Sequence, residues 1–133
     1  MTDRVFFYGT LMTGFDRRRR AGIDSLLDYI GRGYIRAALF DLGIYPAAVP
    51  DPEGVVWGEV YRAVEPDRVL AGLDNIEGYC PEQPEVSLYL RAEVPVAYED
   101  GRTDLVWTYF YNAPLGRAER IASGDYLEHL RVR

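Results

Sequence analysis

The sequence predicts an α+β fold, a small mixed β-barrel or curled sheet with two or three flanking helices. Segments with the composition of strands outnumber segments with helical periodicity. Asp100-Gly101 stands between two apolar segments, a pattern typical of a tight β-hairpin. Neither an internal repeat nor a linker interrupts the chain, so residues 1–133 are expected to form a single domain. Antiparallel-rich sheets of this size commonly curl or close and pack helices on their outside.

Five segments are expected to be strands because they are rich in β-branched and aromatic residues and are bounded by turn-forming residues. They are residues 5–8, 32–42, 55–64, 86–98 and 105–111. The segment from Gly43 to Gly54 contains Pro46, Pro50 and Pro52 and is expected to be a loop.

Apolar residues at helical spacing predict a first helix that Gly31 ends. They are Ile23, Leu26, Leu27 and Ile30. Near the end of the chain, residues 118–130 are weakly helical. Asp125 could cap that helix, with Glu128 three residues later, as in a capping box.

A second helix is predicted between Pro66 and Gly78. Proline suits the first position of a helix, and glycine suits the residue that ends it. The apolar face of this helix is formed by Val69, Leu70, Leu73 and Ile76. Glu77 is therefore expected to be the last helical residue or the first beyond the helix.

The charge composition excludes several classes of protein. The net charge of −6 disfavours nucleic acid as a partner. All 15 basic residues are arginine, so neither a Schiff-base lysine nor the lysine of a P-loop is available. The pattern Gly-x-Ser-x-Gly of a serine hydrolase elbow is also absent from the sequence.

Cysteine and histidine each occur once, as Cys80 and His129. A single cysteine allows no internal disulfide and suits a reducing compartment. One Cys and one His cannot supply the ligands of a typical zinc site, and a catalytic Cys80–His129 pair is disfavoured by their separation in the sequence. With neither a signal peptide nor a membrane-spanning segment in view, we expect a cytoplasmic protein that does not bind membranes.

The first candidate site is the turn Tyr8-Gly9-Thr10-Leu11, which follows the first predicted strand. A strand that ends in glycine and continues through a polar turn leaves successive backbone N–H groups unpaired. Such groups can hold a carboxylate or an oxyanion. The alternative is an ordinary turn at the end of a strand.

The second candidate is Glu77, which follows the apolar face of the second predicted helix. A carboxylate partly removed from water has a raised pKa and can act as a base near neutral pH. A negative charge at the C-terminal end of a helix is also electrostatically disfavoured, which suggests that another constraint keeps it there. The alternative is a solvent-facing glutamate beside a glycine.

The run Arg17 to Arg20 could attract acidic substrates, although a solvated loop or helix start is the favoured interpretation. Together, the exclusions leave an enzyme of this sequence with a carboxylate, tyrosines and backbone N–H groups. Such groups suit a reaction in which the substrate brings its own nucleophile.

Five motifs in order resemble the γ-glutamylcyclotransferase-like family, which includes AIG2-like proteins and γ-glutamylamine cyclotransferases. The similarity runs from about residue 4 to about residue 126. The motifs are Phe-Phe-Tyr8-Gly9-Thr10-Leu11, Trp57-Gly58-Glu59-Val60-Tyr61, Leu73-Asp74-Asn75-Ile76-Glu77-Gly78-Tyr79, Tyr89-Leu90-Arg91 and Trp107-Thr108-Tyr109-Phe110-Tyr111.

The resemblance implies a small mixed barrel with one cavity. It implies that the backbone of Tyr8, Gly9, Thr10 and Leu11 holds a γ-glutamyl group. It also implies that Glu77 is the catalytic acid and base. Two tyrosines are implied as substrate-binding residues, Tyr89 and Tyr109, with Tyr111 as the reserve for the second.

The activity that the resemblance implies is the conversion of a γ-glutamyl amine, amino acid or peptide to 5-oxoproline and a free amine, without a metal or cofactor. Met12-Thr13 stands where many members of the family carry two basic residues, so the leaving amine is left open. Two alternatives remain: a γ-glutamyl hydrolase or acyltransferase acting on a small-molecule conjugate, and a non-catalytic ligand-binding module of the same fold. The oligomeric state is also left open.

Overall fold

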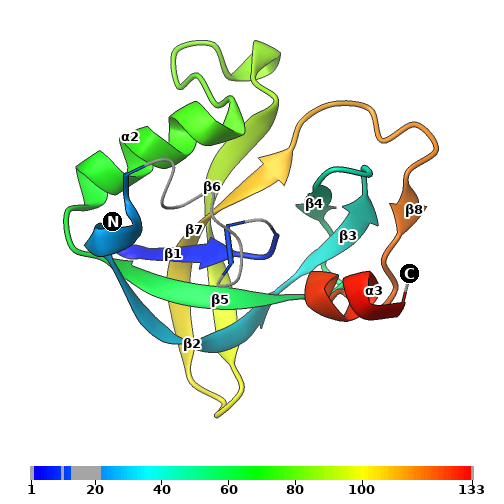
Figure 1. Cartoon of the computed structure of the whole chain (residues 1–133), viewed down its shortest axis with the longest axis horizontal. Coiled ribbons are helices and arrows are strands. Elements are labelled where there is room, and N and C mark those ends of the chain that lie inside the picture. Colours follow the sequence, from blue (N-terminus) through cyan, green and yellow to red (C-terminus); the bar gives the residue numbers. More distant parts are fainter. Residues whose placement is uncertain (1, 10, 13–21, 133) are drawn as a thin grey trace.

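A computed structural model of the chain describes residues 2–9, 11–12 and 22–132. A closed five-stranded barrel, in the order β1-β5-β2-β6-β7, forms its centre (Figure 1). Its strands are β1 (Arg4–Phe7), β2 (Leu27–Ile35), β5 (Val56–Ala63), β6 (Tyr89–Tyr98) and β7 (Thr103–Tyr111). β1 and β7 pair in parallel, whereas the other neighbours in the barrel are antiparallel. The mixed barrel predicted from the sequence is therefore confirmed.

The directions of the strands bring three chain segments to the same end of the barrel. Because β1 and β7 are parallel, with Val5 opposite Trp107, both strands finish at this end. β6 runs the other way, with Tyr89 opposite Tyr111, so its first residue lies there as well. This end of the barrel is where the candidate site forms.

A second, three-stranded sheet lies beside the barrel, in the order β4-β3-β8 (Figure 1). It consists of β3 (Ala37–Asp41), β4 (Pro46–Pro50) and β8 (Glu119–Arg120). β4 falls inside the segment expected to be a loop, so that prediction is wrong in part. The prolines of this segment were the reason to expect a loop, but β4 is an edge strand, where proline is tolerated.

Among the described residues, two α-helices flank the sheets, α2 (Pro66–Glu77) and α3 (Tyr126–Val132) (Figure 1). Val69, Leu70 and Leu73 are the buried residues of α2, and Gly78 ends the helix with a left-handed φ of 64°. The cap predicted for α3 is confirmed, since the Glu128 N–H donates to Asp125 Oδ1 at 3.2 Å. Short 3-10 turns occur at Asp24–Leu26 and Pro84–Val86.

The helix expected from Ile23 to Ile30 is wrong. Only a 3-10 turn forms, and β2 begins at Leu27 and pairs with β5. A β-bulge between Tyr29 and Gly31 inserts an extra residue, and both Leu27 and Ile30 pack against the core. Residues three apart would lie on opposite faces of a regular strand, so the bulge imitates helical spacing.

Three other boundaries differ from those expected. The segment 32–42 divides at Arg36, where the chain leaves the barrel sheet at the end of β2 and enters the second sheet as β3. The strand expected to begin at residue 86 begins at Tyr89, after the 3-10 turn Pro84–Val86. The first part of the tail forms β8 rather than helix, because it pairs with Phe40 and Asp41 of β3.

Gly58→Ala is expected to destabilise the barrel. A Cβ at Gly58 would lie 2.2 Å from the carbonyl oxygen of Phe7 and 2.6 Å from the Phe6 ring. Overpacking of this kind should lower the free energy of unfolding by about 2 kcal/mol. Chemical denaturation measures it, with Gly31→Ala as the matched barrel control because its nearest neighbour, Tyr98, is 3.5 Å away. Equal losses in both variants would contradict this explanation.

Candidate active site

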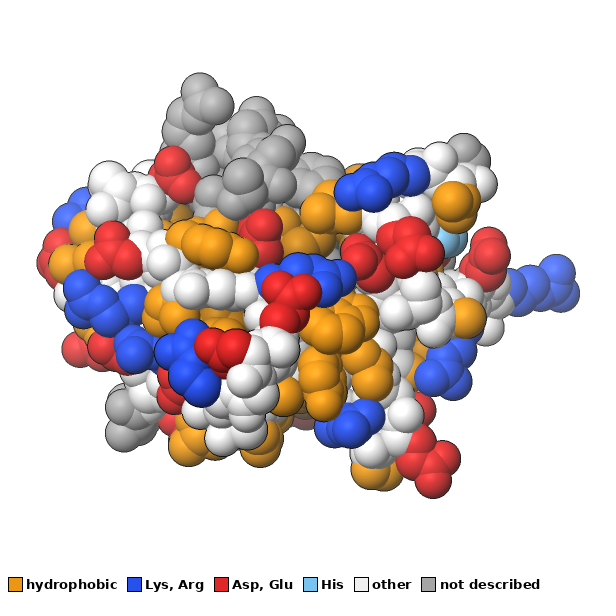
Figure 2. Space-filling model, turned by 90° about the horizontal axis from the view of Figure 1, so that it is seen from below, with side chains coloured by type: hydrophobic (Ala, Val, Ile, Leu, Met, Phe, Trp, Pro, Cys, Tyr) orange, Lys and Arg blue, Asp and Glu red, His pale blue; other side chains and the backbone are white. Residues whose placement is uncertain are grey.

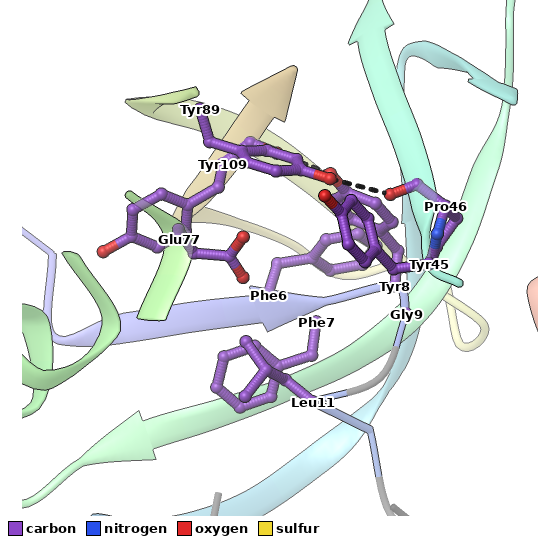
Figure 3. Close-up of a pocket in the computed structure, with 10 residues that line it drawn as sticks. All are labelled: Phe6, Phe7, Tyr8, Gly9, Leu11, Tyr45, Pro46, Glu77, Tyr89 and Tyr109. Carbon is purple, nitrogen blue, oxygen red and sulfur yellow. Dashed lines mark hydrogen bonds between the residues drawn. The ribbon is translucent and has the colours of Figure 1, made fainter. Parts of the chain in front are cut away.

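A narrow cavity opens at the end of the barrel where β1 and β7 finish (Figure 3). Its lining comes from β1 and the turn after it, the β3–β4 connection and the start of β4, the end of α2, and strands β6 and β7. The lining residues are Phe6, Phe7, Tyr8, Gly9, Leu11, Tyr45, Pro46, Glu77, Tyr89 and Tyr109. The volume that the centres of water molecules can occupy inside the cavity is about 30 Å³, which is room for about two waters.

The structure brings together six of the seven residues that the sequence singled out as site residues. These six are Tyr8, Gly9, Leu11, Glu77, Tyr89 and Tyr109. The seventh, Thr10, and the arginine run 17–20 lie outside the described residues. Tyr111 is not among the lining residues; its ring packs on Tyr89 at 5.3 Å between centroids.

The Tyr8–Gly9 corner is held by contacts to two other parts of the chain. Tyr8 is buried, and its hydroxyl donates to the backbone oxygen of Tyr109 at 2.6 Å. A Cβ on Gly9 would lie 2.7 Å from Pro46 Cγ, so glycine here allows the second sheet to approach the turn. The Met12 N–H donates to the Gly9 oxygen at 3.0 Å and closes the turn. Within the described residues, the Gly9 and Leu11 N–H groups have no hydrogen-bond acceptor.

Glu77 is the last residue of α2, as the sequence predicted. Its side chain is half-buried, and the carboxylate is directed into the cavity (Figure 3). The left-handed Gly78 allows the helix to stop there, because glycine adopts this conformation without steric cost. A carboxylate directed into a cavity does not fit the alternative of a solvent-facing glutamate.

The three tyrosines expected at the site each donate their hydroxyl proton within the protein. Tyr8 donates to the Tyr109 backbone oxygen, Tyr89 to the Pro46 oxygen at 3.1 Å, and Tyr109 to Asp74 Oδ1 at 2.5 Å. The Tyr109 hydroxyl points away from the Glu77 carboxylate, so this residue presents its ring to the cavity (Figure 3). In this arrangement none of the three phenols has a proton left to donate to a ligand.

Burial raises the pKa of both Tyr8 and Tyr109. For Tyr8, burial is the largest cause, and the nearby Tyr89 and Glu77 raise the pKa further. For Tyr109, burial is again the largest cause, and the hydrogen bond to Asp74 and the charge of that carboxylate raise the pKa further. Both phenols therefore stay neutral at physiological pH, so they line the cavity and form hydrogen bonds but do not act as bases.

Four lining residues were not predicted from the sequence: Phe6, Phe7, Tyr45 and Pro46. The first two belong to a predicted strand next to the Tyr8 turn, and their adjacency was the available signal. Tyr45 and Pro46 lie in the segment expected to be a loop. Nothing in their spacing connects them to Tyr89, whose hydroxyl reaches Pro46 across 43 positions.

A wider groove of about 350 Å³ lies on the outside of β2 and β5, beside α3. Arg32, one of its lining residues, pairs with Glu99 at 3.1 Å and with Asp125 at 2.9 Å, and lies 4.3 Å from the Trp57 ring centroid. Acidic and basic side chains are likewise interspersed on the face shown in Figure 2. Arg32 already has two carboxylate partners, and the Glu77 cavity gathers six of the residues singled out from the sequence, so the Glu77 cavity is the stronger candidate.

His129 and Cys80 do not form a pair. His129 Nε2 lies 2.7 Å from Asp41 Oδ2 and joins α3 to β3, whereas the Cys80 N–H donates to Ser87 Oγ at 2.8 Å. Among the residues that the structure describes, no three His, Cys, Asp or Glu side chains gather in a way that could hold a metal ion. None of the described helices has the length and apolar character needed to cross a membrane.

Comparison with known proteins places this small mixed barrel in a family. The model of the family "Gamma-glutamyl cyclotransferase, AIG2-like" matches residues 5–128. The γ-glutamylcyclotransferase family protein YtfP of Escherichia coli is 36% identical over 126 residues, which is 94% of this chain and 96% of YtfP. The chain therefore belongs to the AIG2-like γ-glutamyl cyclotransferase family.

Solved structures agree with this assignment. The solution structure of E. coli YtfP is 30% identical, with a TM-score of 0.64 over 95% of this chain and 97% of that one. A mouse AIG2-like protein is 25% identical, with a TM-score of 0.65 over 84% of this chain and 79% of that one. YkqA of Bacillus subtilis is 26% identical with a TM-score of 0.71, and the match covers 99% of this chain but 42% of YkqA.

The raised pKa of Tyr109 predicts how stability changes in alkali. An unfolded tyrosine ionises near pH 10, so the stabilisation is complete below that pH and is lost as the pH rises further, by about 1.4 kcal/mol per pH unit. Urea unfolding of the wild type and of Tyr109→Phe at pH 9 and pH 11 should show a smaller loss in the variant. The absence of lysine keeps this window clear of ammonium titration. Identical losses would contradict the prediction.

Proposed function

We propose that the protein is a γ-glutamyl cyclotransferase that converts a γ-glutamyl amine, amino acid or peptide to 5-oxoproline and the free amine. The observation that carries the proposal is the direction of the Glu77 carboxylate, into a cavity whose other wall is the Tyr8–Gly9 corner. Membership of the cyclotransferase family makes this carboxylate the leading candidate for the acid and base.

The substrate supplies both reacting groups. Its α-amine attacks its own γ-carbonyl carbon, forming a carbon–nitrogen bond and a tetrahedral intermediate. The carbon–nitrogen bond to the leaving amine then breaks and leaves a five-membered lactam. Holding one molecule in the reactive conformation supplies much of the acceleration, because effective concentrations in such closures are high.

Glu77 takes the proton that the attacking nitrogen loses and returns a proton to the leaving nitrogen. The Gly9 and Leu11 N–H groups, which lack acceptors within the described residues, are suited to hold the oxyanion or the α-carboxylate. Thr10 belongs to the same proposed cradle. Tyr8, Tyr89 and Tyr109 shape the cavity and present their rings to the substrate.

The size of the cavity bears on which part of the substrate enters. Room for about two waters is too little for a whole γ-glutamyl peptide. The γ-glutamyl end is the part that contains the reacting atoms. We therefore assign this end to the cavity, which must widen to admit it, and the leaving amine to the mouth.

Purified protein incubated with γ-glutamyl amines, γ-glutamyl amino acids and glutathione should release 5-oxoproline, quantified by mass spectrometry. Glu77→Gln keeps the shape but removes the base and should lower kcat at least about 100-fold. Glu82→Gln is the matched control, because Glu82 is an exposed glutamate five positions further along the chain, outside the cavity lining.

Other products would redirect the assignment. Free glutamate in place of 5-oxoproline would identify a hydrolase, and a new γ-glutamyl conjugate would identify an acyltransferase. A higher melting temperature with γ-glutamyl compounds, without turnover, would identify a binding module. Full activity in Glu77→Gln would overturn the assigned role of the carboxylate.

A further inference from the structure

Glu77 lies at a position where a helix holds its side chain poorly. It is the last residue of α2, and the ends of helices commonly fray because their final carbonyl groups lack helical partners. The helix dipole disfavours a negative charge there, and the last turn of α2 contains no basic residue. A catalytic carboxylate must nevertheless be held to within a fraction of an ångström. Something other than the helix itself must hold this end.

Asp74, one turn before Glu77, attaches α2 to two strands of the barrel. Its Oδ1 accepts a hydrogen bond from the Tyr109 hydroxyl of β7 at 2.5 Å. Arg91 of β6 donates through one nitrogen to both carboxylate oxygens, at 3.1 and 2.9 Å. The Asp74 and Arg91 side chains are only 14% and 21% exposed, so water screens this ion pair less than a surface pair.

The chain just after Glu77 is attached to the same strands. The Tyr79 N–H donates to the backbone oxygen of Asp74 at 2.9 Å. The Tyr79 ring meets the Tyr109 ring nearly at a right angle, with 6.4 Å between centroids. The Arg91 guanidinium lies 5.5 Å from the Tyr79 ring centroid, within the range of a cation–π interaction.

Asp74 and Glu77 are also two carboxylates on one turn, where like charges disfavour the helix. The guanidinium of Arg91 offsets the charge of Asp74 at a distance of 2.9 Å. Asp74, Tyr79, Arg91 and Tyr109, called the α2 clamp below, thus hold the chain on both sides of Glu77 and balance the nearest acidic neighbour.

We propose that Asp74 is a positioning residue, which through the α2 clamp holds the end of α2 on β6 and β7 and so fixes the Glu77 carboxylate in the cavity. Asp74 and Arg91 are not among the residues that line the cavity, so the role proposed for Asp74 acts through Glu77. The catalytic part of this proposal rests on the proposed function. The geometric part, that Asp74 orders Glu77, does not.

Asp74→Asn keeps the size of the side chain but removes the charge that holds Arg91. It should lower kcat about 10- to 100-fold while KM changes little, because small displacements of a catalytic group have effects of this size. Arg91→Lys should retain more activity than Arg91→Met. Asp67→Asn is the matched control, since Asp67 is an exposed acidic residue in the first turn of the same helix.

Two readouts separate positioning from simple stability. Thermal denaturation reports the folded fraction. Amide hydrogen exchange of Gly78 and Tyr79, with the carbon-13 shift of the Glu77 carboxyl, reports the order of the helix end. Positioning requires faster exchange and a changed Glu77 signal in Asp74→Asn, below its melting temperature, and not in Asp67→Asn. A lower melting temperature with unchanged kcat, exchange and Glu77 signal would overturn the proposal.

The outcomes also distinguish failure of the clamp from failure of the proposed function. If the wild type forms no 5-oxoproline but Asp74→Asn loosens the helix end and shifts the Glu77 signal, the proposed reaction fails and the positioning role stands. If the wild type cyclises its substrate and Asp74→Asn behaves like Asp67→Asn in every readout, the positioning role fails and the reaction stands.

Discussion

The parallel pairing of β1 with β7 is the contact on which the rest of the structure depends. It joins the first strand of the chain to a strand about a hundred residues later and closes the barrel, with Val5 opposite Trp107. Contacts of Thr2 secure it: its backbone oxygen accepts from Trp107 Nε1 at 3.1 Å, and its hydroxyl donates to the Leu105 oxygen at 2.7 Å. Without this closure the Tyr8 corner would not meet Tyr109, and the cavity would lose a wall.

Local sequence patterns predicted the elements whose signals are local. Pro66 and Gly78 bounded α2, and Asp100-Gly101 marked the β6–β7 turn, because capping and turn chemistry act over a few residues. The predictions failed where pairing with distant strands decided the outcome. The bulge in β2 imitated a helix, and β4 exists because β3 pairs with it.

The residues of the candidate site also divide into those with a local sequence signal and those placed by distant contacts. Glu77 and the Tyr8 turn could be singled out because each follows a recognisable element and belongs to a family motif. Tyr45 and Pro46 could not, because they reach the cavity only through the second sheet. Asp74 was visible within a motif, but its bonds to Arg91 and Tyr109 depend on how α2 lies against the barrel.

The two walls of the cavity belong to different sheets. The proposed chemistry lies on the barrel and α2, whereas Tyr45 comes from the connection between β3 and β4 and Pro46 is the first residue of β4, held to the barrel by the Tyr89 hydroxyl. Ile44, at the tip of that connection, is 84% exposed, so the tip itself has few neighbours to constrain it. Evolution or an engineer could therefore lengthen or reshape this hairpin to change what the cavity admits, while the barrel and α2 kept their form.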